Sequence, residues 1–377
     1  MGKEIIRLDK DDYEELIWVL NTVFSESNVV PVDMEKALPK MCKPDNEHMN
    51  KHFAIRENGS IKSVVGVYPL PAIVAGMPVK FSTVGNIATM KDSRGKGYMS
   101  LLVDAAMEEL KRIGADASRL GGKRSRYQRY GFEPCGTVYR FTLNKNIALE
   151  TVKPNTNIVF KKLNINSPEL EAGLTFHRKN KFLIRKETVD EYYDTITAWR
   201  NIPYGAYTES GEFVGVVGAT PDKSEITELD CKSSDVYKDI ILSWLNINEN
   251  TVVSVMPHMT EEIMFLWSIN TSLSVHDASQ FAIFNFKKII EATLKLKAEY
   301  SKIPDFEHII EIKDTGRFLL KSENNITLCT DTKKSPDVIL ERGEASRYLF
   351  GPLPANVINK GCVALPLPLT WNLQDRV

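Results

Sequence analysis

The sequence has few residues suited to covalent cross-links or metal binding. Its five cysteines lie far apart among 377 residues, at Cys42, Cys135, Cys231, Cys329 and Cys362. Because none of them has CxxC spacing and their number is odd, we expect small buried thiols rather than a disulfide framework or a zinc site. The six histidines also lack HExxH-type spacing, so no metal is expected in the chemistry.

Long apolar runs and an excess of charge of one sign are missing as well. No run of 18 apolar residues is present, and the N-terminal segment MGKEIIRL lacks the apolar core of a signal peptide. The 48 basic and 49 acidic side chains give a formal net charge of -1, which does not favour a nucleic acid or an anionic membrane as partner. These features predict a cytoplasmic protein of two or three domains.

The first 145 residues alternate between strand-like and helix-like patterns. We expect strands at 4–8, 53–56, 61–74, 84–90, 117–120 and 137–143, and helices at 11–24, 97–113 and 125–130. In this interpretation 137–143 closes the sheet of the first unit. A polar stretch at 153–167, with proline and asparagine, then separates this unit from the next.

The rest of the chain divides into a middle and a C-terminal region. The middle region has helical patterns at 189–199 and 236–245, a hairpin at 204–219 and a strand at 251–255. An amphipathic helix at 283–298 begins the C-terminal region, followed by strands at 308–312, 317–321 and 326–329. The pattern predicts a mixed α/β (α+β) protein.

The segment from Asn86 to Met99 carries the clearest chemical signal. A strand leads into a basic glycine loop, Arg94-Gly95-Lys96-Gly97, and a helix follows. The first backbone N–H groups of a helix have no intrahelical partner and favour an anion, and glycine lets that backbone approach a phosphate. The loop lacks the GKS or GKT of a P-loop and the GxGxxG of a dinucleotide fold. A plain glycine turn before a surface helix is the alternative interpretation.

A short basic cluster interleaved with Tyr127 and Tyr130 follows about 30 residues later. Its basic members are Lys123, Arg124, Arg126 and Arg129. Arginines alternating with aromatics also suit a single-stranded nucleic acid. Because the cluster is short and the chain is nearly neutral, the phosphates of a coenzyme explain these charges more economically.

The loop, together with the segment Tyr127–Phe132 (YQRYGF), resembles the GNAT superfamily of N-acetyltransferases. Met99 stands where most members have glycine or alanine, and this departure resembles the Eis (enhanced intracellular survival) branch. The chain length and the approach GKRSRY before the tyrosine resemble that branch too. The resemblance implies two tandem GNAT-like mixed-sheet domains, at 1–145 and 146–284, the second without a cofactor loop. It further implies a sterol-carrier-protein-like α+β domain with a C-terminal tail at 285–377.

The resemblance also implies roles for individual residues. Acetyl-CoA is the co-substrate, and its binding residues correspond to Ile87, Ala88, Thr89, Arg94, Gly95, Lys96, Gly97, Tyr98 and Met99. A backbone N–H near Ile87 or Ala88 faces the thioester carbonyl, and Thr89 pairs with the pantetheine arm. Tyr127 protonates the leaving thiolate, and the α-carboxylate of Val377 accepts the proton of the amine.

Acceptor binding is assigned to Phe24 and Glu26 near the end of the first helix, although Glu26 also suits a solvated helix end. We therefore predict an acetyl-CoA-dependent N-acetyltransferase acting on a primary amine of a small molecule, aminoglycoside-like or polyamine-like, or on a lysine. A lipid or small-molecule binding protein with a vestigial or regulatory CoA site is the alternative. The family also implies a homo-oligomer, hexameric in known members.

Overall fold

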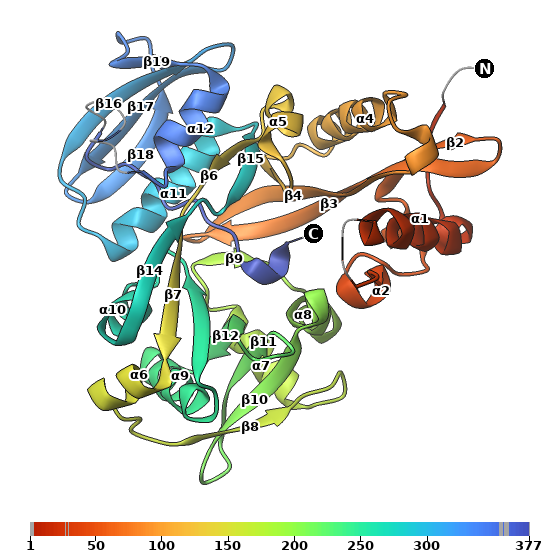
Figure 1. Cartoon of the computed structure of the whole chain (residues 1–377). Coiled ribbons are helices and arrows are strands. Elements are labelled where there is room, and N and C mark those ends of the chain that lie inside the picture. The colour runs from red at the N-terminus through yellow and green to blue at the C-terminus, as the bar shows by residue number, and fades with distance from the viewer. Residues whose placement is uncertain (1–3, 27, 29, 354–356, 358–361, 377) are drawn as a thin grey trace.

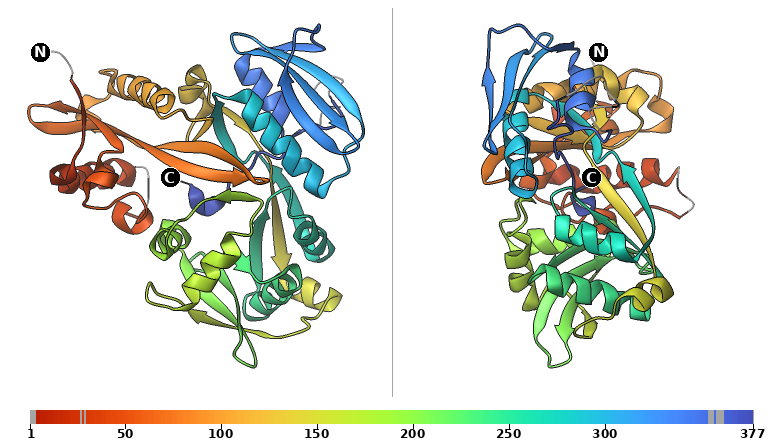
Figure 2. Two further views of the ribbon diagram at one scale, coloured as in Figure 1. Left: turned by 180° about the vertical axis from the view of Figure 1, so that it is seen from behind. Right: turned by 90° about the vertical axis from the view of Figure 1, so that its left-hand side faces the viewer.

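The computed structural model describes residues 4–26, 28, 30–353, 357 and 362–376. It arranges the chain in three units, each built on its own sheet (Figure 1). The first and third units lie side by side, and the second packs beneath them, as both views of Figure 2 show. The protein is thus a mixed α/β structure with several mixed sheets, as the sequence pattern predicts.

The first sheet runs in the order β1-β2-β3-β4-β5-β15-β6, with β9 beside β3. Its strands are β1 (Ile5–Arg7), β2 (His52–Glu57), β3 (Ser60–Val74), β4 (Met77–Thr89), β5 (Ala117–Leu120), β6 (Glu133–Cys135), β9 (Phe182–Ile184) and β15 (Ser279–Ile283). The helices of this unit are α1 (Tyr13–Ser25), α2 (Met34–Ala37), α3 (Asn46–Met49), α4 (Tyr98–Arg112) and α5 (Arg124–Tyr127).

Helices α1 and α4 cover opposite faces of this sheet because strand side chains alternate between its faces. Val64 packs into the core beneath α1, whereas its neighbour Val65 packs beneath α4. Leu16 and Leu20 of α1, and Leu102 and Leu110 of α4, are completely buried in these two cores. The periodicity that predicted both helices therefore reflects the faces they bury.

The second sheet runs in the order β14-β7-β13-β12-β11-β10-β8. Its strands are β7 (Val138–Asn144), β8 (Ile158–Lys162), β10 (Ile202–Thr208), β11 (Phe213–Ala219), β12 (Glu225–Cys231), β13 (Asn250–Val255) and β14 (Asn270–His276). Its helices are α6 (Lys145–Thr151), α7 (Glu169–His177), α8 (Val189–Ile196), α9 (Ser234–Ile247) and α10 (Thr260–Ile269). Val216 and Val217 of β11 bury against α7–α8 and α9–α10 respectively, so this sheet also has two covered faces.

The third sheet, β18-β17-β16-β19, packs on α11 (Phe286–Tyr300) and α12 (Arg342–Phe350). Its strands are β16 (Phe306–Ile312), β17 (Gly316–Glu323), β18 (Ile326–Asp331) and β19 (Val338–Leu340). None of the helices in the described residues combines the length and apolar character needed to cross a membrane.

Three strands correct the sequence-based assignment. The strand predicted at 137–143 to close the first sheet is β7, which pairs with β13 and β14 in the second sheet. The chain leaves the first sheet at Gly136, whose φ of +79° turns it away, and Phe141 and Leu143 bury in the second core. In return β15, expected within the second unit, inserts between β5 and β6. Strand β8 forms inside the stretch taken as a linker, at 153–167. Side-chain alternation identifies a strand but not its sheet.

The C-terminal segment crosses the molecule between the first sheet and the second unit (Figures 1 and 2). Trp371 is 1% exposed. Its ring packs edge to face with Phe81 of β4 and Phe281 of β15, at ring-centroid distances of 5.5 Å and 5.9 Å. The tail therefore completes the core of the first sheet.

We expect Trp371→Ala to lower the free energy of unfolding by about 3–5 kcal/mol, because it empties a fully buried site. Trp267→Ala is the matched control, since Trp267 of α10 is 58% exposed and a surface change costs within about 0.5 kcal/mol. Urea unfolding of both variants measures the difference. Equal effects would show that the tail does not stabilise the first unit.

Candidate active site

The site forms where β4 and β5 separate. The two strands pair in parallel from Phe81 with Ala117 to Val84 with Leu120, and beyond that point β5 ends. On its other side β4 pairs with β3 through a bulge, in which Asn86 and Ile87 together face Val65. A bulge bends its strand and redirects its backbone groups. The backbone at Ile87 therefore turns toward the opening between the two strands.

A buried polar chain holds this bulge. Asn86 has a φ of +51°, in the left-handed region that asparagine tolerates better than other non-glycine residues. Its Nδ2 donates to the Tyr68 hydroxyl at 2.6 Å, and that hydroxyl donates to Nε2 of His52 at 2.8 Å. Burial lowers the pKa of His52 to about 4, so the ring is neutral and its Nδ1–H donates to the Met49 carbonyl at 3.3 Å. Sequence reasoning missed this chain, although Gly85-Asn86 inside a strand is a bulge signal.

The basic loop follows β4 as predicted. A short 3-10 turn, Lys91–Ser93, leads to Gly95 and Gly97, whose φ values are +80° and +81°. Gly97 directly precedes α4, whose first turn contains no acidic residue. The N-terminal amides of this long helix and the glycine backbone have the arrangement that suits an anion.

Both basic side chains of the loop carry carboxylate partners. Arg94 Nη2 lies 2.6 Å from Oε2 of Glu26, and Lys96 Nζ lies 2.7 Å from Oε2 of Glu57. Arg94 Nε also donates to the Thr89 carbonyl at 3.2 Å. Glu26, assigned in the sequence analysis to the amine acceptor, thus pairs with the loop.

Two cavities meet at the separation of β4 and β5. The loop cavity, about 630 Å³, is lined by most of the predicted cofactor residues: Ile87, Thr89, Arg94, Gly95, Gly97, Tyr98 and Met99. Ala88 is 1% exposed and Lys96 turns to Glu57, and neither belongs to this lining. The interdomain cavity, about 800 Å³, lies between the β4 bulge, the α1–α2 segment and residues 199–200 of the second unit. Both cavities include Phe24, Asn28, Ile87, Arg126 and Tyr127.

Tyr127 stands at this junction because of the residues around it. It ends the short helix α5 and is 5% exposed. Its ring packs on Gly122, where a Cβ would lie 2.9 Å from Tyr127 Cε2, so the site requires glycine there. Burial raises the pKa of the Tyr127 phenol, and the charge of Arg126 opposes the rise. The phenol is therefore protonated at neutral pH and suits a proton donor.

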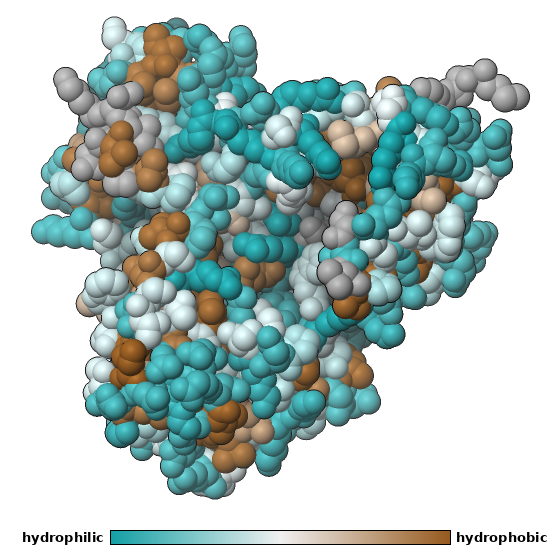
Figure 3. All heavy atoms as spheres, viewed as in Figure 1, coloured by the Kyte–Doolittle hydropathy of each residue, from teal (hydrophilic) through white to brown (hydrophobic). Residues whose placement is uncertain are grey.

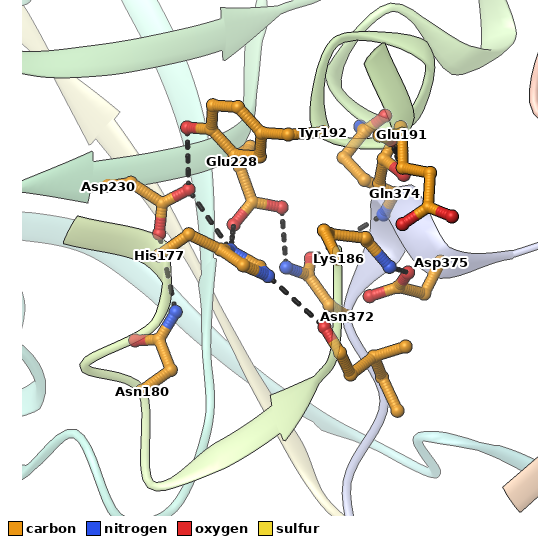
Figure 4. Close-up of polar contacts among 12 residues, drawn as sticks. His177, Asn180, Lys186, Glu191, Tyr192, Glu228, Asp230, Asn372, Gln374 and Asp375 are labelled. Atoms are coloured by element: carbon orange, nitrogen blue, oxygen red, sulfur yellow. Dashed lines mark hydrogen bonds and ion pairs between the residues drawn. The ribbon is translucent and has the colours of Figure 1, made fainter. Parts of the chain in front are cut away.

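The tail reaches a buried polar cluster beside this region (Figure 4). Lys186 forms an ion pair with Asp375, Asn372 donates to Glu228, and Lys40 donates to the Gln374 carbonyl. Burial lowers the pKa of Lys40 to about 7, and the Asp375 carboxylate opposes that effect. Val377, assigned by resemblance as the base, lies outside the described residues.

The same cluster holds possible metal ligands that sequence spacing does not reveal. One ligand atom each of His177, Glu228 and Asp230 lies within 4.8 Å of the others. All three already have internal partners: His177 Nδ1 lies 3.2 Å from Asp230 Oδ2 and Nε2 lies 3.3 Å from the Ile184 carbonyl. Tyr192 also donates to Asp230 at 2.9 Å. These contacts fit a protonated His177 bridging α7, β9 and β12.

A strand pair that separates over the N-terminus of a helix, with a buried tyrosine at the opening, is thus the geometry of the site. Residues 4–135 match the family model of the acetyltransferase (GNAT) domain. The comparison with curated proteins finds no match. The sequence match ends at the Gly136 turn, before β7 enters the second sheet.

Solved structures resemble the whole chain. A probable N-acyltransferase from Enterococcus faecalis aligns with a TM-score of 0.67 at 13% identity, over 100% of this chain and 97% of that one. A GCN5-related N-acetyltransferase from Anabaena variabilis gives 0.66 at 13%, over 98% of both chains. Eis1 from Mycobacterium abscessus gives 0.64 at 12%, over 95% of this chain and 92% of that one. At these identities the likeness establishes the fold, and with the GNAT match it supports an acyltransferase.

We expect the stabilisation from His177 to depend on pH. Burial lowers its pKa, but the Asp230 and Glu228 carboxylates together outweigh burial and raise the pKa to about 9, from an ordinary 6.5. A group whose pKa is higher in the folded protein than in the unfolded chain contributes its full stabilisation at pH values below the unfolded-state pKa. That stabilisation is lost as the pH rises through the folded-state pKa. The difference in unfolding free energy between wild type and His177→Gln should therefore shrink by roughly 3 kcal/mol from below pH 6.5 to above pH 9.

Urea unfolding across this pH range measures the effect. His276→Gln is the control, because the exposed His276 ring of β14 bonds only locally, to Ser274. A difference that stays constant with pH would contradict a protonated His177.

Proposed function

We propose that the chain is an acetyl-CoA-dependent N-acetyltransferase. The observation that carries this proposal is the meeting of the loop cavity and the interdomain cavity at Ile87 and Tyr127. Acetyl-CoA occupies the loop cavity, with its pyrophosphate at Gly95, Gly97 and the start of α4. A primary amine enters from the interdomain cavity. Aminoglycoside-like and polyamine-like molecules and lysine are the acceptor classes that the family resemblance suggests.

Amide formation from a thioester needs an oxyanion donor and a proton for the leaving thiolate. The backbone N–H at the bulge, near Ile87, donates to the carbonyl oxygen as the amine nitrogen attacks the carbonyl carbon. The C–S bond then breaks, and the Tyr127 hydroxyl gives its proton to the sulfur. Beyond Val84, β4 lacks β5 as a neighbour, and this edge suits pairing with the pantetheine arm at Thr89.

Wider proposals on architecture, assembly, location and metal use accompany this one. The units at 1–145 and 146–284 act as a GNAT-like tandem, with β7 and β15 exchanged between their sheets, and the unit at 285–377 is sterol-carrier-protein-like. The chain is a homo-oligomer, and it works in the cytoplasm without a metal ion.

Tyr127→Phe should lower kcat by about 10²-fold or more while the KM for acetyl-CoA changes little, because only the proton donor is removed. Thiol release from acetyl-CoA with a panel of primary amines measures the rate. Tyr130→Phe is the control, since Tyr130 lies three residues away and its hydroxyl bonds to Ser100 and Arg129. Wild-type kcat in Tyr127→Phe would refute the assigned role.

We also propose that the α-carboxylate of Val377 accepts the proton of the attacking amine. Support comes from the anchoring of the preceding residues, since Asp375 and Gln374 are 2% and 1% exposed and bind Lys186 and Lys40. A frayed end would not keep a base in position.

Extending the chain by two glycines after Val377 moves the carboxylate and should lower kcat by about 10²-fold or more. Val377→Ala keeps the carboxylate and should retain kcat, so it separates the charge from the side chain. A pH–rate profile of each variant completes the measurement. Unchanged turnover in the extended chain would exclude the carboxylate as base.

A further inference from the structure

The charges around the interdomain cavity have one sign. Among its described lining residues, the only formally charged side chains are Arg126 and Arg200, and no aspartate or glutamate is present. The remaining lining is mostly apolar or backbone. Its apolar side chains include Phe24, Ile87, Tyr127 and Trp199.

The nearest candidate carboxylates are engaged elsewhere. Glu26 pairs with Arg94 of the loop at 2.6 Å. Asp33, at the start of α2, lies 2.8 Å from Lys36 Nζ, and the charge of Arg200 helps to lower the pKa of its carboxyl. Neither Glu26 nor Asp33 belongs to the lining. A polycationic amine entering here would meet two guanidinium groups and no carboxylate of the described lining, and like charges repel.

Arg200 comes from the second unit on an unusual turn. Trp199 and Arg200 have φ values of +60° and +64°, a region that bulky residues rarely occupy. Backbone strain of this kind persists where the surroundings hold it, and it concentrates at binding sites. Here Asn201 holds the turn, because its buried Nδ2 donates to the Ala198 carbonyl at 2.6 Å and to Gln374 Oε1 of the tail at 3.2 Å.

The turn presents its side chains to the opposite wall. Arg200 Nη2 donates to the Pro31 carbonyl at 3.3 Å, and Trp199, although 46% exposed, lines the cavity. On the face in Figure 3, hydrophilic residues predominate and hydrophobic ones are scattered in small groups. The tryptophan ring can stack on an aromatic ligand, and the neighbouring arginine can bind a carboxylate. The pair therefore suits the recognition of an aromatic acid.

Arg126 has a different task. It lines both cavities, and its charge lowers the pKa of the neighbouring Tyr127 phenol against the effect of burial. A cation there lies beside the reacting thioester, which is the same for every acceptor. Its charge therefore does not discriminate between acceptors. Arg200, which lines the interdomain cavity and does not line the loop cavity, is the cation able to distinguish one acceptor from another.

We propose that the acceptor is a primary amine with an apolar, preferably aromatic body and an acidic group remote from the amine. Trp199 packs on the body, Arg200 binds the acid, and the amine reaches Ile87. This inference rests on the proposed N-acetyltransferase function and narrows its acceptor away from polycations. A cavity of about 800 Å³ accommodates a ligand of this size.

The test uses three acceptors with one skeleton and different charge: 4-(aminomethyl)benzoate, 4-(aminomethyl)benzamide and 1,4-bis(aminomethyl)benzene. We expect the kcat/KM of the wild-type enzyme for the benzoate to exceed that for the benzamide by about tenfold or more, as one charge-assisted contact provides. The bis-amine should be the poorest. A bis-amine that equals or exceeds the benzoate would overturn the proposal.

Variants test the assigned residues. Arg200→Gln should lower kcat/KM for the benzoate about tenfold and leave the benzamide within about threefold, since only the charge contact is lost. Trp199→Ala should lower both together. Arg185→Gln is the control, because Arg185 is a similarly exposed arginine outside the cavity lining. An equal loss for benzoate and benzamide in Arg200→Gln would refute the role of the charge.

Calorimetric binding in the presence of CoA separates this inference from the proposed function. Benzoate binding that Arg200→Gln abolishes, without thiol release from any amine, would support the acid site and refute the acetyltransferase. Turnover that prefers the bis-amine would retain the enzyme and refute the acid site. Absence of both binding and turnover would refute both.

Discussion

The separation of β4 from β5 after Val84 is the constraint on which the site depends. In parallel pairing, the backbone N–H and C=O groups of the two strands hydrogen-bond to each other. Because the pairing stops at Val84, the backbone groups of β4 near Ile87 are open to another partner. The opening is kept by the left-handed Asn86, whose amide is bound to Tyr68 and through it to His52. Because these three side chains are buried, an unmade hydrogen bond there would cost more than one at the surface. The bulge is therefore held by the core beneath it.

The geometry of the glycine loop and the helix after it was largely predictable, because it is encoded locally. A strand, two glycines and an amphipathic helix follow one another in the chain, and the anion site is made of their backbone. The position of Tyr127 beside Ile87 also follows from a short segment. The family resemblance supplied the assigned roles, and the structure brings most of these residues to one cavity.

The acceptor side was not predictable, because it is assembled from distant segments. Trp199 and Arg200 meet the segment after α1 only once the second unit has packed on the first. Likewise, nothing in the spacing of Lys40, Lys186 and Asp375 indicates that they meet in the interior. The sheet membership of β7 and β15 depends on the same long-range packing, and alternation alone does not specify it.

Strand β15 has a consequence for the order in which the protein is made. It fills the space between β5 and β6, so the first sheet is incomplete until residues 279–283 have been synthesised. Domains usually fold from the N-terminus during translation. Here the nascent acyl-transfer unit keeps two unpaired strand edges until the whole second unit has left the ribosome. During that interval the edges of β5 and β6 are open to pairing with other chains, and a chaperone that binds extended segments would have its substrate there.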